Sequence, residues 1–176
     1  RPLAAAVTAA LYLFAALPQP ANAQSPAAAS AAPYDYQLQP QQVADGVYVV
    51  LGHNEDFSPH NGGNIANVGI LIGDDGVVLI DSGPSRRYGE QLQAAVTHLT
   101  PLPVVMVIHT HHHPDHVLGA QVFTGAQRAA LPEVQQQLAS EGGTLLDNMY
   151  RLNGAWMQGT QPSVMVMVGK RMWNEM

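Results

Sequence analysis

The chain has 176 residues, with seven Lys and Arg against thirteen Asp and Glu and a formal net charge of −6. This balance argues against nucleic acid as a partner, because domains that bind its phosphate backbone have basic surfaces. The absence of cysteine excludes disulfide frameworks and cysteine-ligated zinc. Hydrophobic residues make up 47% of the chain, enough for a packed core, whereas charged residues make up only 11%, against roughly 25% in typical soluble proteins.

Residues 1–42 have the composition of a secretory signal peptide followed by a linker. A basic residue, an apolar run of about 15 residues and Ala21-Asn22-Ala23 follow one another in the order of a secretory signal peptide. The run is shorter than the roughly 20 residues that span a bilayer. We predict a cleaved signal peptide at 1–23, an Ala/Pro/Gln-rich linker at 24–42, and a periplasmic or secreted protein that meets the membrane only through its signal. An uncleaved anchor and a disordered arm are the alternatives.

The next segments predict β-strands joined by one long loop. Residues 43–51 alternate in polarity and are β-branched, which predicts a strand with a turn at Asp45-Gly46. Residues 52–67 are rich in Gly, Asn and Pro, and loops of this length are more often functional than idle. Strands are predicted at 68–72 and 77–80, joined by an Asp-Gly hairpin turn.

Helices and a buried strand are predicted after residue 84. Residues 85–99 carry apolar side chains at helical spacing and precede Pro101. The continuous apolar run at 104–108 predicts a buried strand. Further helices are predicted at 117–122, 132–140 and 144–156. Strands alternating with helices indicate an α/β layered unit.

The strongest chemical signal is His111-His112-His113-Pro114-Asp115-His116, directly after the buried strand. Side chains two positions apart in extended backbone point to the same side, so His111 and His113 can meet one cation. Asp115 and His116 follow a proline that turns the chain toward a second position nearby. Imidazole and carboxylate suit Zn²⁺, and Mn²⁺ or Fe²⁺ would also accept this set.

The other histidines are expected outside this ligand set. We expect His109 and His112 to face solvent or to support the ligands from outside, and His98 to lie on the surface of its helix. A histidine tract can also be a nonspecific chelator or a tag. A tag, however, is not followed by Pro-Asp-His and then by apolar sequence.

Residues 110–116 resemble the T-H-x-H-x-D-H signature of the metallo-β-lactamase superfamily, preceded in the expected order by Leu79-Ile80-Asp81-Ser82-Gly83 and a helix. The resemblance covers roughly residues 43–125 and implies an αββα sandwich of two similar halves with metal in the cleft between them. The loop 57–67 resembles that of exported quinoprotein relay system zinc metallohydrolases, which implies a link to periplasmic quinoprotein dehydrogenase systems.

The resemblance implies a role for each matching residue. His111 and His113 would bind a first zinc, and Asp115 and His116 a second, with Asp115 also acting as the catalytic residue that handles protons of the attacking water. Asp81 would orient the ligands from beneath, or serve as a helix N-cap or turn residue. The substrate loop would contribute His60, Asn61 and Asn64.

The metal ligands that the family carries downstream are missing, since no histidine follows His116 and Asp147 is the one later Asp. We therefore predict the amino-terminal half of the sandwich at 43–161, incomplete and inactive as an enzyme on its own. Residues 162–176 form an atypical Met-rich tail, read as a shifted frame or an artefact, or as a genuine strand at 164–168.

The predicted function is zinc-dependent hydrolysis of a small molecule, in which one or two metal ions activate water against an ester, thioester, lactone or β-lactam bond. A non-enzymatic periplasmic metal-binding protein is the first alternative, because the ligand set is incomplete. A di-iron redox enzyme of the same fold is the second.

Overall fold

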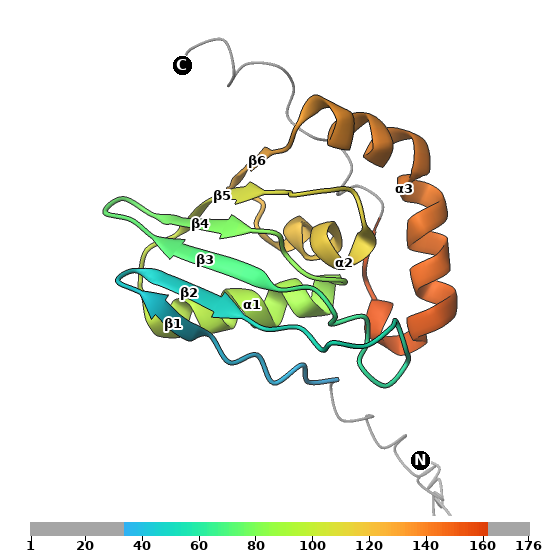
Figure 1. Cartoon of the computed structure of the whole chain (residues 1–176), viewed down its shortest axis with the longest axis horizontal. Coiled ribbons are helices and arrows are strands. Elements are labelled where there is room, and N and C mark those ends of the chain that lie inside the picture. Colours follow the sequence, from blue (N-terminus) through green and yellow to red (C-terminus); the bar gives the residue numbers. More distant parts are fainter. Residues whose placement is uncertain (1–33, 162–176) are drawn as a thin grey trace, which may run out of the picture. The chain divides into compact units, whose positions relative to one another are not determined.

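A computed structural model describes residues 34–161 of the chain (Figure 1). Its strands and helices follow one another as β1 (Gln41–Ala44), β2 (Val47–Val50), β3 (Val68–Ile72), β4 (Val77–Ile80), α1 (Arg86–Leu99), β5 (Val104–Ile108), α2 (Pro114–Val117), β6 (Gln127–Ala129) and α3 (Pro132–Asn153). Short 3₁₀ turns at Leu118–Val122 and Gly154–Met157 follow α2 and α3. The described residues thus form an α/β unit, as the sequence predicts.

The six strands lie in one sheet in sequence order. Strands β1 to β4 pair antiparallel through hairpins, whereas β5 and β6 join parallel to β4. Because β3 runs against β4, the loop 51–67 that precedes β3 lies at the same edge of the sheet as the carboxyl ends of β4 and β5. The sheet topology therefore brings three segments that carry predicted site residues to one edge.

Helix α1 covers one face of the sheet (Figure 1). The Oγ of Ser85 caps its amino end by accepting from the N–H of Tyr88. Its buried side chains pack against alternate residues of the strands. Together these residues make up the main core, which includes Val68, Ile70, Val77, Leu79, Tyr88, Leu92 and Val96. Removing this much apolar surface from water is the dominant favourable term in the folding of the unit.

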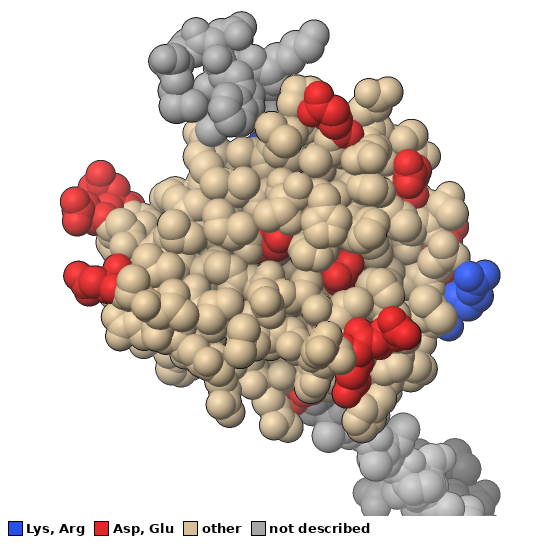
Figure 2. Space-filling view, in the orientation of Figure 1, with Lys and Arg blue, Asp and Glu red and all other residues tan. Residues whose placement is uncertain are grey.

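The opposite face of the sheet carries apolar side chains that are only half covered. Val49, Val78 and Ile80 are partly buried on this face, and Leu71 is 38% exposed. Figure 2 views the molecule from this side and shows a surface that is mostly uncharged, with acidic side chains at separated positions. An apolar sheet face of this kind ordinarily packs against another layer.

A second apolar cluster joins α3 to α2 and to the turn that follows it. Its buried members are Val117, Leu118, Ala130, Val134, Leu138, Leu146, Met149 and Met157. This packing matters for the site, because α2 carries Asp115 and His116. Helix α3 thus supports the short helix that holds half of the predicted metal motif.

The strands predicted at 68–72, 77–80 and 104–108 are confirmed, and the helix predicted at 85–99 begins one residue later. The strand at 104–108 is less buried than its apolar run predicts, because Val107 is its one buried residue and Val105 is 41% exposed. The turn at Asp45-Gly46 joins β1 to β2, so the strand predicted at 43–51 is a hairpin.

The predicted linker at 24–42 is wrong for the residues from 34 onward. Tyr36 is 7% exposed and packs in the main core, and its hydroxyl bonds to the carbonyl of Gly62 and to Ser85. Strand β1 already begins at Gln41. The folded unit therefore starts before the boundary that low-complexity composition indicates.

Three further elements differ from the sequence-based expectation. The helices predicted at 132–140 and 144–156 are one helix, α3, because Gly142 falls on its buried stripe. Helix α2 begins at Pro114 rather than at 117, and β6 was not predicted. The predicted signal peptide and the tail at 162–176 lie outside the described residues. Among residues 34–161, no helix combines the length and apolar character needed to cross a bilayer.

Candidate metal centre

The predicted metal motif occupies the turn between β5 and α2. Ile108 ends the strand, and His113 precedes α2 in an extended conformation, with φ −64° and ψ 145°. Pro114 then takes the first helical position, where its fixed φ and missing N–H cost nothing. The chain therefore turns from strand to helix inside the motif, which places His111 and His113 before the turn and Asp115 and His116 after it.

Backbone contacts tie this turn to the end of β4. The N–H and the hydroxyl of Ser82 both donate to the carbonyl of His116, at 2.8 and 3.0 Å. Gly119 lies directly against the carbonyl of Ser82, and a side chain at this position would collide with it. The close approach that glycine allows keeps α2 pressed against the carboxyl end of β4.

Asp81 links the two segments through its carboxylate. Its Oδ1 accepts from the N–H of Thr110 (2.9 Å), and its Oδ2 accepts from the hydroxyl of Thr110 (2.7 Å) and from Nδ1 of His116 (2.8 Å). The residue is 3% exposed and adopts φ 62°, a left-handed conformation that Asp tolerates better than most residues. Asp81 thereby orients the ring of His116 and leaves Nε2 facing away from it.

The charges in this cluster shift one another's pKa. Burial raises the pKa of Asp81, but its hydrogen bonds from His116 and Thr110 outweigh burial and hold it below the ordinary value. Burial lowers the pKa of His116, yet the carboxylates of Asp115 and Asp81 outweigh it and raise the value to about 9. The two carboxylates therefore favour a positive charge at this position, which either a proton on His116 or a metal ion that replaces this proton can supply.

The imidazoles of the motif lie close together. The ring centroid of His111 is 3.8 Å from that of His116 and 4.7 Å from that of His113. The Nδ1 of His111 is 3.0 Å from the hydroxyl of Thr110, and burial together with the two neighbouring imidazoles lowers the pKa of His111. A neutral imidazole is the form that binds a metal ion.

Asp115 and His116 have the geometry of two ligands on one cation. Asp115 is 5% exposed, and its Oδ2 lies 3.3 Å from Nε2 of His116. A tetrahedron with metal–ligand bonds of about 2.0–2.1 Å has an edge of about 3.3 Å, so one zinc ion fits both atoms. The other oxygen of Asp115 is buried and has no hydrogen-bond partner. The chemistry and spacing of this pair fit a zinc ion.

The described residues offer fewer ligands to one metal ion than a catalytic zinc site requires. Within residues 34–161, no three side chains of His, Asp or Glu converge on one point that could hold a metal ion. The motif supplies two pairs instead, and catalytic zinc normally has three protein ligands and a water. The described residues thus fit zinc by donor type and not by donor count.

The remaining histidines take separate positions. His109 is 3% exposed, so it does not face solvent, and neither ring nitrogen has a hydrogen-bond partner. Burial lowers its pKa to about 4. The Nε2 of His112 lies 3.5 Å from a carboxylate oxygen of Glu141 on α3. His98 is exposed on α1, as predicted.

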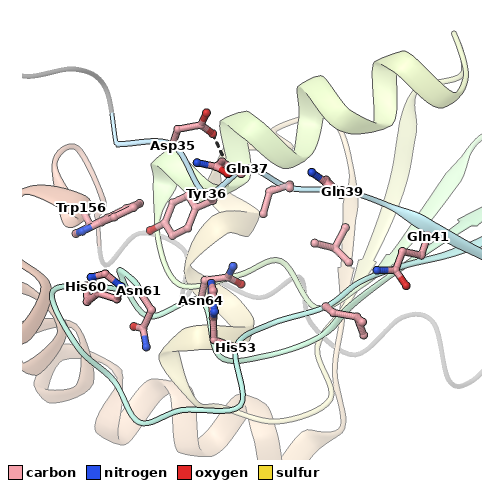
Figure 3. Close-up of a pocket in the computed structure, with 13 residues that line it drawn as sticks. Asp35, Tyr36, Gln37, Gln39, Gln41, His53, His60, Asn61, Asn64 and Trp156 are labelled. Atoms are coloured by element: carbon pink, nitrogen blue, oxygen red, sulfur yellow. Dashed lines mark hydrogen bonds between the residues drawn. The ribbon is translucent and has the colours of Figure 1, made fainter.

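The predicted substrate-loop residues line a different hollow from the histidine cluster. His60, Asn61 and Asn64 border a cavity together with His53 and Trp156, and no residue of the motif lines it (Figure 3). Their predicted contact with a substrate stays a prediction.

The side chain of Asn61 is used within the loop. Its Nδ2 donates to the carbonyl of Asp56 (2.9 Å), and its Oδ1 accepts from the N–H groups of Gly63 (2.9 Å) and Ser58 (3.2 Å). These bonds give Asn61 a role in holding the loop. Trp156 was not predicted as part of this region. Its indole donates to the carbonyl of Pro59, which lies 97 positions earlier, and nothing in the sequence around Trp156 indicates this contact.

Comparison with known proteins gives one family and several solved relatives. The sequence profile of the metallo-beta-lactamase superfamily matches residues 61–159. A crystal structure of a metallo-beta-lactamase from Hirschia baltica is 23% identical with a TM-score of 0.51, over 60% of this chain and 48% of that chain. The metallo-beta-lactamase FIM-1 from Pseudomonas aeruginosa in the mono-zinc form is 17% identical with a TM-score of 0.50, over 60% and 46%.

Among curated proteins, a linear primary-alkylsulfatase from Pseudomonas sp. (strain ATCC 19151) is 31% identical over 75 residues. That match covers 43% of this chain and 14% of the alkylsulfatase. The chain therefore spans about half the length of the two solved relatives and a much smaller part of the curated one.

Proposed function

Because the chain belongs to the metallo-β-lactamase superfamily, a superfamily with a hydrolase fold, we propose that it is the amino-terminal part of an exported zinc-dependent hydrolase. The observation that carries the proposal is the cluster at the carboxyl ends of β4 and β5. There Asp81 holds His116, and the Nε2 of His116 lies 3.3 Å from Asp115, at the spacing of two ligands of one zinc ion.

The donors of the motif divide into two pairs in this proposal. His111 and His113 hold one zinc ion, Asp115 and His116 hold a second, and the remaining ligands come from the complete gene product rather than from these 176 residues. Asp81 orients His116, and Asp115 accepts or returns a proton of the attacking water. Bound zinc would lower the pKa of that water and polarise the bond under attack.

The proposed substrates are small molecules with an ester-like bond. The similarity to an alkylsulfatase supports sulfate esters, and the superfamily supports acyl esters, thioesters, lactones and β-lactams. We further propose a place beside periplasmic quinoprotein dehydrogenases, supported by the loop 57–67. Amino-terminal sequencing of protein recovered from a periplasmic fraction tests export, and a mature chain that starts at Gln24 is expected.

The test of the enzymatic proposal uses the 176-residue chain and the complete product of its gene, each with zinc or with a chelator. The substrates are p-nitrophenyl sulfate, p-nitrophenyl acetate, nitrocefin and an acyl thioester. We expect zinc-dependent hydrolysis of one class by the complete product and none by the 176-residue chain. Strong hydrolysis by the 176-residue chain would contradict the proposal that its metal site is incomplete. Absence of hydrolysis by both proteins would contradict the proposal that the protein is an enzyme.

A non-enzymatic metal-binding protein is the second candidate, and the two-donor sets within residues 34–161 favour it. Such a protein needs no open position on the metal for an attacking water. It would bind zinc in both forms and hydrolyse nothing in either, so the same experiment separates the two candidates.

A further inference from the structure

The sheet face that points away from α1 is apolar across four neighbouring strands. Strand pairing sets which residues share it, because Leu71 of β3 lies between Val47 of β2 and Val78 of β4. We call this surface the open face, and its aliphatic members are Val47, Val49, Leu71, Val78, Ile80, Met106 and Ile108. The edge strands add the amides of Gln41 and Gln127. The open face of the described sheet therefore has an apolar centre, an amide at each edge and no charged side chain.

The open face is only half covered. Leu71 is 38% exposed, and the other six aliphatic residues are partly exposed. Helix α1 lies behind the sheet in Figure 1, which looks onto the open face. An antiparallel sheet with one face in water places polar residues on that face, whereas β4 reads Val-Val-Leu-Ile and is apolar on both of its faces. A contiguous apolar patch of this kind marks an interaction surface.

The width of the open face limits what can cover it. Strands lie about 4.8 Å apart, so the four strands β2 to β5 present a surface roughly 15–20 Å wide. The strand predicted at 164–168 would cover about 5 Å of this width, and the predicted signal peptide is removed on export. A second sheet of similar size would cover the whole width at once.

The distribution of charge fits a second copy of the chain as the source of that sheet. The net charge of −6 opposes self-association in general, but the acidic turns with Asp45 and with Asp74 and Asp75 lie beyond the strand ends. Figure 2 shows this side of the molecule as mostly uncharged, with acidic side chains at separated positions. A basic or acidic partner would find no complementary charge on the open face. A second copy would meet it without a like-charge contact.

We propose that the 176-residue chain forms a symmetric dimer in which the open faces of two copies pack together as a β-sandwich. Two sheets of the same twist pack face to face with their strands about 30° apart and their side chains interdigitated. A twofold axis brings the same patch of each copy into the interface, so Leu71 and Val78 are buried in both. The inference concerns the 176-residue chain itself and is independent of zinc binding and of hydrolysis.

The test is sedimentation velocity of the full 176-residue chain from about 5 to about 200 µM, with a chelator present so that metal ions cannot bridge two copies. Leu71→Arg places a like charge from each copy in the interface, and the partial exposure of Leu71 leaves the main core intact. Leu152→Arg is the matched control, because Leu152 is 42% exposed on α3 and lies outside the open face. Circular dichroism checks that both variants are folded.

We expect a reversible dimer with a dissociation constant below about 100 µM. Leu71→Arg should raise this constant at least tenfold, because two buried like charges oppose association, and Leu152→Arg should change it less than twofold. A chain that stays monomeric up to about 200 µM would overturn the proposal. So would an unchanged dissociation constant in folded Leu71→Arg, which is the result expected if the predicted signal peptide or the tail at 162–176 causes the association.

A second measurement locates the interface in the unaltered chain and stays decisive even if Leu71→Arg fails to fold. Methyl NMR spectra are recorded over the same range of concentrations. The methyl signals of Leu71 and Val78 should shift with concentration, and those of Leu152 should not. Concentration-dependent shifts confined to residues outside the open face would overturn the proposal.

Discussion

The two halves of the metal motif are held in different ways. After the turn, His116 is bonded to the buried carboxylate of Asp81 at 2.8 Å, and its backbone carbonyl accepts twice from Ser82. Before the turn, His113 is exposed, and His111 meets the hydroxyl of Thr110 at 3.0 Å. We call Asp115 and His116 the anchored pair, and His111 and His113 the outer pair.

This difference indicates which pair is organised by the described residues alone. When a carboxylate holds one ring nitrogen of a histidine, the other nitrogen binds a metal ion with less loss of side-chain freedom. The anchored pair has that support from β4 and from α2, which packs against α3. The outer pair depends on Thr110, whose hydroxyl is already engaged with Asp81. This contrast leads to four testable predictions.

Replacing Asp81 with Asn should have the largest effect on stability. The amide cannot accept all three hydrogen bonds, and one of its hydrogens would face a donor in a buried site. We expect the free energy of unfolding to fall by about 3 kcal/mol, measured by urea denaturation. The control is Asp147→Asn on the exposed face of α3, for which a change within about 0.5 kcal/mol is expected. Equal effects of the two variants would mean that Asp81 does not hold the site.

Alanine substitutions in the two pairs should weaken zinc binding unequally. Loss of the preorganised His116 should raise the zinc dissociation constant on the order of 100-fold, and loss of the exposed His113 about 10-fold. Competition with a chromophoric chelator measures both. The reverse order would show that the outer pair dominates and would break the contrast.

Thr110→Val should lower the stability of the fold moderately. It removes the hydroxyl that bonds to Asp81 at 2.7 Å and leaves the hydrogen bond from the backbone N–H to Asp81 intact. We expect a loss of about 1.5 kcal/mol in the free energy of unfolding. Thr97→Val on the exposed face of α1 is the matched control, expected to change it by less than about 0.5 kcal/mol. No difference between the two variants would contradict the bonding described for Thr110.

Glu141→Gln should have the smallest effect on the free energy of unfolding. The carboxylate lies 3.5 Å from His112, and the side chain of Glu141 is 54% exposed. Exposed pairs of this kind contribute roughly 0–1 kcal/mol, so thermal and urea unfolding should barely change. A loss above about 2 kcal/mol would mean that α3 holds the motif through this contact and not only through its apolar packing.

Much of the fold can be predicted from apolar runs. The segments 68–72, 77–80 and 104–108 are strands that each contribute side chains to the main core, although Val107 is the one buried residue of the last. The cluster at the end of β5 can be predicted because strand ends project side chains from a sheet edge, and four donor residues of the same chemistry stand within six positions there.

Other features depend on partners that are distant in sequence. Tyr36 stands in a Gln- and Pro-rich stretch, and its burial follows from contacts with α1 that composition does not reveal. Gly142 does not break α3, because it falls on the stripe of that helix that packs against α2 and tertiary packing outweighs its low helix propensity. The cavity beside Asn64 likewise needs Trp156, a residue nearly a hundred positions away.

The role of Asp81 as organiser of the metal motif can be measured by comparing the zinc affinity of Asp81→Asn with that of the unaltered chain, because Asp81 is not itself a proposed ligand. The measurement is a competition titration against a chromophoric chelator at neutral pH. If Asp81 organises the anchored pair, the zinc dissociation constant should rise about 10–100-fold in a variant that remains folded at the assay temperature. An unchanged dissociation constant would contradict the claim that the metal motif is built around the bond between Asp81 and His116.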